Sequence, residues 1–219
     1  MTTFQRPRSK TSRKHKPPSP RLTKLSSDRT GIGKKHVDGP NGEFISIKGA
    51  VTVQETVETV GEMSFTDQDS MISITLPNVR SIYELAFQGC SSLRTVNSPK
   101  LEYIDSHAFS KCGALKNIIL DGVRTIRDGA FERCINLENI NLPKVKKIQN
   151  GAFRHCTGLK SITLSIKTGI DKLTWYTRGS VDDRAPFFGC TSLNSITFTG
   201  TCEDGKLRIQ QNPFTGCAN

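Results

Sequence analysis

The sequence contains the motif Ala-Phe-x-x-Cys four times, and each copy follows the previous one after 22 residues. The four copies end at Cys90, Cys112, Cys134 and Cys156. Between two copies stands Leu-x-x-Ile-x-Leu-Pro-x-Val-x-x-Ile, as in residues 137–148. A strict period of this length indicates a solenoid, in which a repeat buries its apolar side chains only by stacking on its neighbours.

Each repeat has the pattern of one short strand and a return segment. Leu-x-x-Ile-x-Leu predicts a strand with its apolar residues facing inward, and the following proline ends it. The Val and Ile of the return segment and the Phe of the motif then fill the coil. We therefore expect a right-handed, β-rich parallel solenoid of about seven coils, with its strands on the concave face. The seven Phe slots are Phe65, Phe87, Phe109, Phe131, Phe153, Phe187 and Phe214.

The full repeat, Leu-x-x-Ile-x-Leu-Pro-x-Val-x-x-Ile-x-x-x-Ala-Phe-x-x-Cys, resembles the BspA-type (Treponema pallidum-type) leucine-rich repeat over about residues 57–217. The resemblance implies a leucine-rich repeat fold. It also implies kinship with surface adhesins of bacteria and protists, which bind host or matrix proteins. The motif itself holds no catalytic group, so it is specific for a fold and says little about function.

The charge of the chain is concentrated at its N-terminus. Residues 1–36 hold eleven of the 31 Lys and Arg residues and one of the 20 acidic residues, which gives +10 there and +1 for the rest. Residues 1–40 are also rich in Pro and Ser and poor in large apolar residues, so we expect a disordered basic tail before a solenoid over residues 41–219. The tail suggests a tether to nucleic acid or an anionic membrane, a nuclear localisation signal at Lys10–Lys16, or simply a solvated segment.

Several features bear on the compartment. No apolar run approaches the ~20 residues of a membrane-spanning helix, and the N-terminus lacks the hydrophobic segment of a secretory signal. Four of the seven cysteines occupy one repeat position, which favours stacked core thiols in a reducing compartment over disulfides. We expect a cytoplasmic or nuclear location, whereas the family resemblance alone implies the cell surface.

An insertion interrupts the repeats at residues 165–186. Cys156 and Cys190 are 34 residues apart, one period plus twelve, and the surplus includes the only tryptophan. Trp175, Tyr176 and Arg178 have the composition of an interaction hot spot in a long loop. The equal alternative is that the loop folds back and buries Trp175. After Cys217 the chain ends at Asn219 with its last coil uncapped, which suggests either truncation or self-association through that open edge.

The outward positions of the predicted strands form a polar strip that is a candidate binding face. The alternative is a Ser/Thr/Asn ladder that only keeps the sheet soluble, since Trp, Tyr and Arg are missing from it. The strip consists of Ser73, Thr75, Thr95, Asn97, Asn117, Ile119, Asn139, Asn141, Ser161, Thr163, Ser195 and Thr197.

A basic edge runs beside this strip and could meet an acidic partner or phosphate. Acidic residues stand close to it in sequence, which favours a solvated surface of mixed charge. The basic residues are Arg80, Lys100, Arg124, Lys144, Lys146 and Lys147, and the nearby acids are Glu102, Asp105, Asp121 and Asp128.

No catalytic, metal or cofactor motif is present in the sequence. His107 and His155 occupy variable slots of the repeat, no Cys/His spacing suits a metal, and no Gly-rich phosphate loop follows a strand. We expect a non-enzymatic scaffold without cofactors, which binds another protein through the strip and the Trp175 loop. The alternatives are a passive solenoid tethered by its basic tail, and a surface adhesin-like protein.

Overall fold

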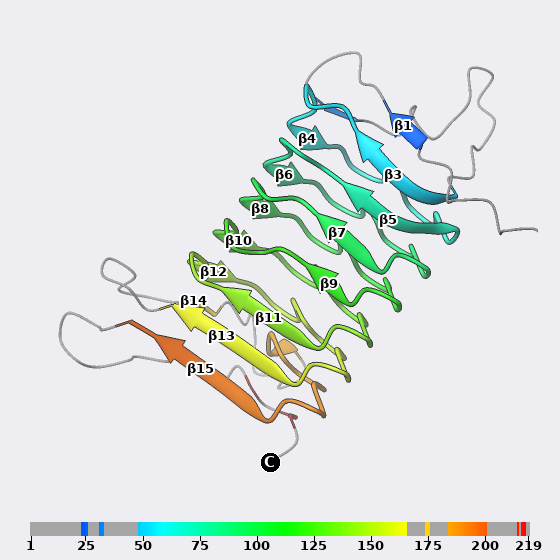
Figure 1. Cartoon of the computed structure of the whole chain (residues 1–219). Helices are drawn as coiled ribbons and strands as arrows, with labels where there is room; N and C mark the ends of the chain where they lie inside the picture. The colour runs from blue at the N-terminus through cyan, green and yellow to red at the C-terminus, as the bar shows by residue number, and fades with distance from the viewer. Residues whose placement is uncertain are drawn as a thin grey trace, which may run out of the picture.

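The structure is a computed structural model of the chain. It describes residues 48–165, 184–200, 214 and 216–217, with the backbone of residues 23–25, 31–32 and 174–175. These residues form a parallel β-solenoid whose coils stack side by side, and no α-helix occurs among them (Figure 1). The fold class predicted from the 22-residue period is therefore confirmed.

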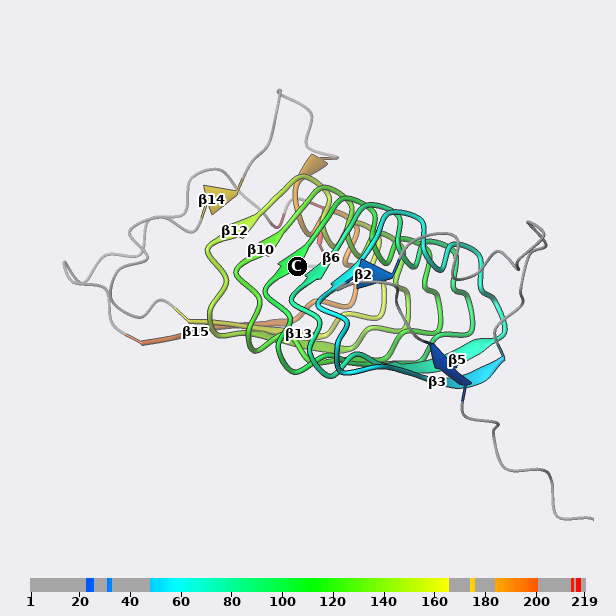
Figure 2. The ribbon, with the colours of Figure 1, turned by 90° about the horizontal axis from the view of Figure 1, so that it is seen from above.

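One side of the solenoid carries the longer strands, and we call it the long-strand face (Figures 1 and 2). Neighbouring strands pair in parallel, so that residues 22 apart, such as Ser73, Thr95 and Asn117, lie opposite one another. The ladder is interrupted between β9 and β11, which divides the face into five and three strands. The strands are β1 (Thr23–Leu25), β3 (Gly49–Val53), β5 (Met71–Thr75), β7 (Thr95–Asn97), β9 (Asn117–Ile118), β11 (Asn139–Leu142), β13 (Ser161–Ser165) and β15 (Ser195–Thr199).

The return segments form a second sheet of seven short parallel strands. Its inward column contains Val60, Ile82, Ile104, Ile126 and Ile148, which are in register with one another and fully buried. The strands are β2 (Gly31–Ile32), β4 (Thr59–Val60), β6 (Ser81–Ile82), β8 (Tyr103–Ile104), β10 (Thr125–Ile126), β12 (Lys147–Ile148) and β14 (Thr174–Trp175).

A column of phenylalanine rings runs through the interior. Adjacent rings are stacked with centroids 5.0–5.3 Å apart, and the column joins all seven predicted Phe slots. Backbone hydrogen bonds connect the same coils beside the rings: the N–H of Phe109 donates to the carbonyl oxygen of Ala130, in the next coil, at 2.7 Å. Because every ring packs on the ring of the next coil, the coils share one continuous core.

Two backbone positions in each turn of the Ala-Phe-x-x-Cys motif adopt a left-handed conformation. The first precedes the alanine, as at Leu85, His107 and Gly129, and the second precedes the cysteine, as at Lys111 and His155. Residues other than glycine pay roughly 1–2 kcal/mol for this conformation, and stacking of the neighbouring coils holds them in it. Both histidines thus occupy turn positions of the repeat.

The structure also describes parts of two segments that the sequence placed outside the regular repeats, the predicted disordered tail and the insertion. The backbone of residues 23–25 and 31–32, within the predicted tail, pairs with β3 and β4. After the insertion, Phe153 N donates to Pro186 O at 2.7 Å, so the repeat resumes with Pro186 at the alanine position. The remainder of residues 1–40 and most of the insertion lie outside the described residues, and the predicted domain boundaries stay predictions.

Candidate functional site: a partner interface

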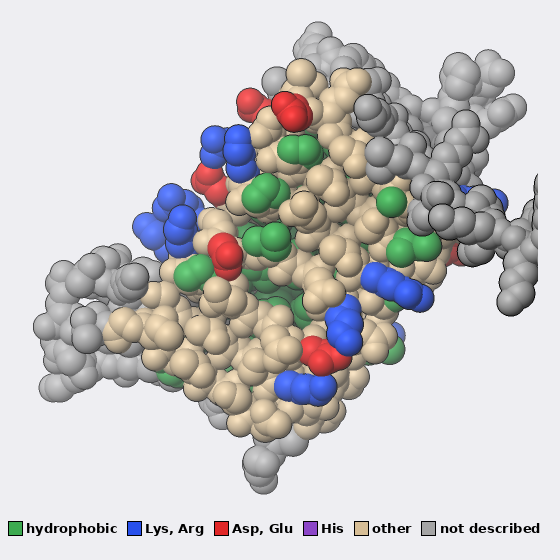
Figure 3. All heavy atoms as spheres, viewed as in Figure 1, with side chains coloured by type: hydrophobic (Ala, Val, Ile, Leu, Met, Phe, Trp, Pro, Cys, Tyr) green, Lys and Arg blue, Asp and Glu red, His purple; other side chains and the backbone are tan. Residues whose placement is uncertain are grey.

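The polar strip predicted from the sequence lies on the long-strand face. All twelve of its residues are exposed or half-buried. The alternate residues of most of these strands, such as Ile74 and Ile162, are buried, whereas Ile196 in β15 is exposed. In Figure 3 this face is mostly uncharged, and Lys, Arg, Asp and Glu side chains gather along its two sides. The outward orientation of the strip is thus observed, and its role in binding stays a prediction.

A shallow depression of about 510 Å³ interrupts the strip where the ladder breaks after β9. Its lining is mixed: Thr95 and Asn117 contribute polar groups, whereas Ile119 is an exposed apolar residue with 43% of its surface accessible. Across the break, the Asn141 side chain donates a hydrogen bond to Asp121 at 3.1 Å. The depression therefore combines hydrogen-bonding groups with apolar side chains, of which Ile119 is the most exposed. It is lined by Thr95, Val96, Asn97, Asn117, Ile118 and Ile119.

At the amino ends of the long strands, the charges are paired across coils. The Glu138 carboxylate lies between Lys116 and Lys160, with each ammonium 3.0 Å away. Hydrogen bonds from these two lysines lower the pKa of Glu138 below its ordinary value. At this edge, two lysines from different coils therefore share one carboxylate.

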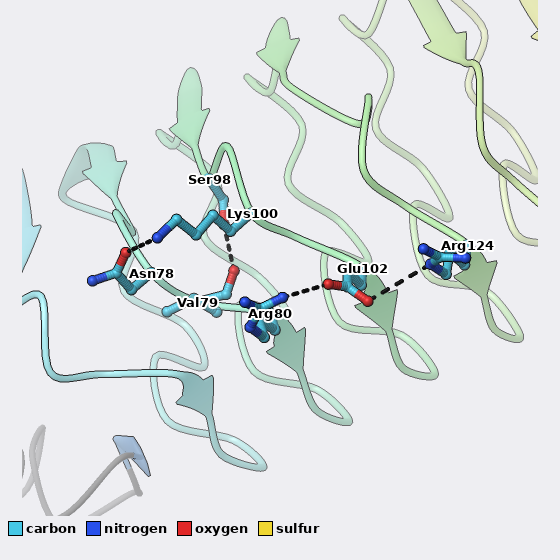
Figure 4. A network of polar contacts seen from close by, with 7 residues as sticks. All are labelled: Asn78, Val79, Arg80, Ser98, Lys100, Glu102 and Arg124. Atoms are coloured by element: carbon cyan, nitrogen blue, oxygen red, sulfur yellow. Dashed lines mark hydrogen bonds and ion pairs between the residues drawn. The ribbon is translucent and has the colours of Figure 1, made fainter.

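At the opposite ends of the long strands, the chain turns toward the second sheet and forms a basic corner (Figure 4). Glu102 pairs with Arg80 at 2.6 Å and lies 3.7 Å from Arg124, so three successive coils are connected. Lys100 donates instead to a neutral group, the side-chain oxygen of Asn78, at 2.7 Å. A hollow of about 200 Å³ opens among these side chains; its lining is Arg80, Pro99, Lys100, Glu102, Gly122, Arg124 and Lys144.

Next to this corner, the second sheet exposes an aromatic cluster that the sequence reading missed. The rings of Tyr83 and Tyr103 are 6.3 Å apart, and Tyr83 is 42% exposed. Arg127 donates to the Tyr103 hydroxyl at 3.0 Å and pairs with Asp105 at 3.3 Å. Partial burial raises the pKa of Tyr103, and the hydrogen bond from Arg127 opposes that shift.

The cysteine column is structural. Each thiol of the ordered coils donates to a phenylalanine carbonyl of the preceding coil, as Cys134 Sγ does to Phe109 O at 3.2 Å. Burial raises the pKa of the thiols of Cys112, Cys134, Cys156 and Cys190, for Cys190 to about 12, so the reactive thiolate of these residues is scarce at neutral pH. The histidines belong to the turns, where the His107 ring covers Gly129 and the His155 ring covers Gly189.

The described residues show neither a metal site nor a membrane span. No group of three or more His, Cys, Asp or Glu side chains in this part of the chain could hold a metal ion. Nor does it contain a helix that is long and apolar enough to cross a membrane. The absence of enzymatic activity and of cofactors stays a prediction.

The backbone of Trp175 is in register with Ile148 on the neighbouring strand. The backbone of residue 175 therefore occupies the position in its strand that Ile148 occupies in β12. Tyr176 and Arg178 lie outside the described residues, as does the rest of the basic tail apart from the backbone of β1 and β2. Both readings of the Trp175 loop, and tethering by the tail, remain open predictions.

Stacked coils of this length, with a strand, a return segment and a phenylalanine column, define a parallel solenoid of the leucine-rich repeat class. Residues 46–160 match six copies of the BspA type leucine rich repeat region. The chain therefore belongs to the BspA-type leucine-rich repeat family, and a repeat fold of this kind suggests a protein-interaction scaffold.

One solved structure agrees with this assignment, and a second match is weaker. The leucine-rich repeat protein of T. pallidum matches with 27% sequence identity and a TM-score of 0.57, over 81% of each chain. A leucine-rich repeat protein from Bacteroides ovatus matches with 16% identity and a TM-score of 0.31, over 89% of this chain and 73% of that one. No curated protein matches this sequence.

Proposed function

We propose that this protein is a non-enzymatic scaffold that binds a partner protein across the polar strip of its long-strand face. The observation that carries the proposal is the depression after β9, where Ile119 is exposed between hydrogen-bonding side chains. An interface needs an apolar anchor point surrounded by polar groups, and the strip has this arrangement at one place.

The remainder of the strip suits the flanks of such an interface. Its small uncharged side chains would let a partner approach the sheet closely, and successive strands offer donors and acceptors in rows. Some of these groups already satisfy one another, since Ser161 donates to Asn139 at 2.6 Å. We therefore assign most of the binding energy to the depression and an orienting role to the rows beside it.

The Trp175 loop is the second contact of the proposed interface, through Trp175, Tyr176 and Arg178. The backbone register of Trp175 with Ile148 supports the competing reading, in which this residue belongs to the solenoid. Tryptophan fluorescence of the native protein separates the two. A strongly blue-shifted emission that resists quenching would remove Trp175 from the interface, whereas a quenchable emission near that of exposed tryptophan would support it.

The strip is tested with two exposed isoleucines. Ile119 lines the depression, and Ile135, 49% exposed in a turn before β11, lies outside it. The full-length protein, Ile119→Asp and Ile135→Asp are compared by quantitative affinity purification. We expect a partner that is retained by Ile135→Asp and reduced at least about tenfold by Ile119→Asp, as for a central interface contact. Equal recovery by all three proteins would contradict the proposal.

A further inference from the structure

We propose that the basic corner is a second binding site, which takes an extended acidic segment of a partner protein and seats one carboxylate over Gly122. The site is the hollow among Arg80, Lys100, Glu102, Arg124 and Lys144. These side chains come from successive coils. Figure 4 shows Arg80, Glu102 and Arg124 in a row across three coils, with Lys100 beside them. This site is separate from the polar strip and does not depend on the function proposed for it.

The hollow exists because one column of the repeat lacks a side chain. Asn78, Lys100 and Lys144 fill this column in the neighbouring coils, and Gly122 stands between the two lysines. A Cβ atom on Gly122 would lie 2.6 Å from the carbonyl oxygen of Leu101, which is too close for any side chain. Packing of the coils therefore keeps the floor of the hollow open, with a lysine on each side.

The positive charge of the hollow exceeds what its own acids neutralise. Four cations and one carboxylate line it, which gives a net charge of +3. The carboxylate, Glu102, is held by Arg80 at 2.6 Å, and Arg124 is left at 3.7 Å. Within residues 48–165 and 184–200, the Lys144 ammonium has no hydrogen-bond or ion-pair partner.

The other acids that stand close in sequence point to different partners. Asp105 pairs with Arg127, and Asp121 accepts a hydrogen bond from Asn141. Asp128 accepts one from the backbone N–H of Asn150 at 3.0 Å. The sequence favoured a solvated surface of mixed charge because of these three acids and Glu102. Of the four, only Glu102 lines the hollow. An incoming anion would therefore meet cations that the fold leaves largely uncompensated.

The chemistry around the hollow favours a peptide over other anions. Glu102 lies between the two arginines and would repel a uniformly charged polyanion such as nucleic acid. A peptide, in contrast, has backbone N–H groups that can donate hydrogen bonds to this carboxylate. Tyr103, the first residue of β8, directly follows Glu102 in the sequence, and the rings of Tyr103 and Tyr83 together offer an apolar contact. A segment with alternating acidic and apolar residues would place carboxylates toward the corner and apolar side chains toward the tyrosines.

The test measures binding of a fluorescein-labelled peptide of eight residues, with Glu alternating with Leu, by fluorescence anisotropy to the full-length chain. A peptide with Gln in place of every Glu is the ligand control. The site variant is Arg124→Gln with Lys144→Gln. The protein control is Lys116→Gln with Lys160→Gln, which removes the same charge from the opposite edge. All three proteins keep the basic tail, so its contribution to binding is equal.

We expect wild type to bind the Glu peptide more tightly than the Gln peptide. The site variant should bind the Glu peptide at least about fivefold more weakly than wild type does, because it loses two ion pairs, each of which can contribute up to about fivefold in affinity. The protein control should stay within about twofold of wild type. Equal weakening of both variants would overturn the proposal in favour of net charge. Tighter binding of a single-stranded oligonucleotide, lost in the site variant, would overturn the peptide as occupant. Ile119→Asp should leave peptide binding unchanged, which separates this site from the strip.

Discussion

The phenylalanine column inside the solenoid and the charged columns at its edges repeat with the same 22-residue period, but they vary very differently. All seven positions of the interior column hold phenylalanine. At the basic corner, the column that begins with Arg80 continues with Glu102, Arg124 and Lys146. A buried ring must match the ring on either side of it, whereas an exposed charge can exchange its partner for water. The interior phenylalanine column is therefore fixed by the fold, and irregularities in the charged columns at the edges (the outer columns) indicate candidate sites.

The largest expected effect is at the interior column. Phe131→Ala removes a fully buried ring that is stacked on Phe109 and Phe153. A loss of about 3–5 kcal/mol in the free energy of unfolding follows from the cavity, which corresponds to a fall of roughly 6–20 °C in Tm for a chain of this size. Circular dichroism melts of the full chain measure it.

The control for Phe131→Ala is Asn117→Ala, which truncates an exposed residue of the strip and should change Tm by about 2 °C or less. If Phe131→Ala lowers Tm by less than about 1 °C, the phenylalanine column does not hold the coils together. A melt in two separate steps would also contradict a single continuous core.

These interior contacts explain how much of the fold the sequence could reveal. The Ala-Phe-x-x-Cys spacing, the Ile column of the second sheet and the resumption at Phe187 all follow from side chains that must face the same neighbours. The left-handed turn positions gave no such signal, because Leu85, His107 and Arg133 adopt them without glycine. The break between β9 and β11 could not be foreseen either, since the spacing around it is unchanged.

The second prediction concerns Gly122, which has no side chain in the repeat column of Asn78, Lys100 and Lys144 and so leaves room for the hollow. Gly122→Ala places a Cβ 2.6 Å from the Leu101 carbonyl oxygen, so the two coils must move apart. We expect a loss of about 1–3 kcal/mol in the free energy of unfolding, as for overpacking. Gly113→Ala is the matched control, because its Cβ would meet no atom closer than Ile135 Cγ1 at 4.0 Å.

Urea unfolding of the two alanine variants measures the difference. Gly113→Ala should lie within about 0.5 kcal/mol of wild type. Equal stabilities of the two variants would show that the coils can accept a side chain at 122, and that packing does not require the hollow. The outer columns would then vary freely even at the basic corner.

The candidate sites were harder to predict than the fold, for reasons visible in the same residues. The sequence placed four acids near the basic edge, but the direction in which Asp105 and Asp121 point depends on partners from neighbouring coils. Tyr83 and Tyr103 are 20 residues apart rather than 22. They therefore occupy different columns of the repeat and meet only in the folded sheet, so aligning the repeats could not bring them together.

The smallest expected effect is at the amino ends of the long strands, where Glu138 lies between Lys116 and Lys160. These lysines lower the pKa of Glu138 in the folded state below its value in the unfolded chain. The stability from these pairs is therefore present above the unfolded pKa, near 4.5, and is lost as the pH falls through the folded pKa. Glu138→Gln should lower Tm by only about 1–2 °C at pH 7, because surface pairs contribute little. At about pH 3 the difference from wild type should shrink, since the carboxylate takes up a proton as the pairs are lost.

Glu55→Gln removes the same charge from an exposed residue whose carboxylate has no partner among the described residues, and it should leave Tm unchanged at both pH values. An equal shift for Glu55→Gln and Glu138→Gln would mean that net charge, rather than pairing across coils, sets the stability at this edge. A shift at Glu138 as large as that of Phe131→Ala would show that the outer columns are as tightly constrained as the core. A small, pH-dependent shift would instead show that ion pairs can connect the coils of an outer column without fixing its residues. That freedom is what allows the basic corner, with nearly the same residue types, to keep cations available for a partner.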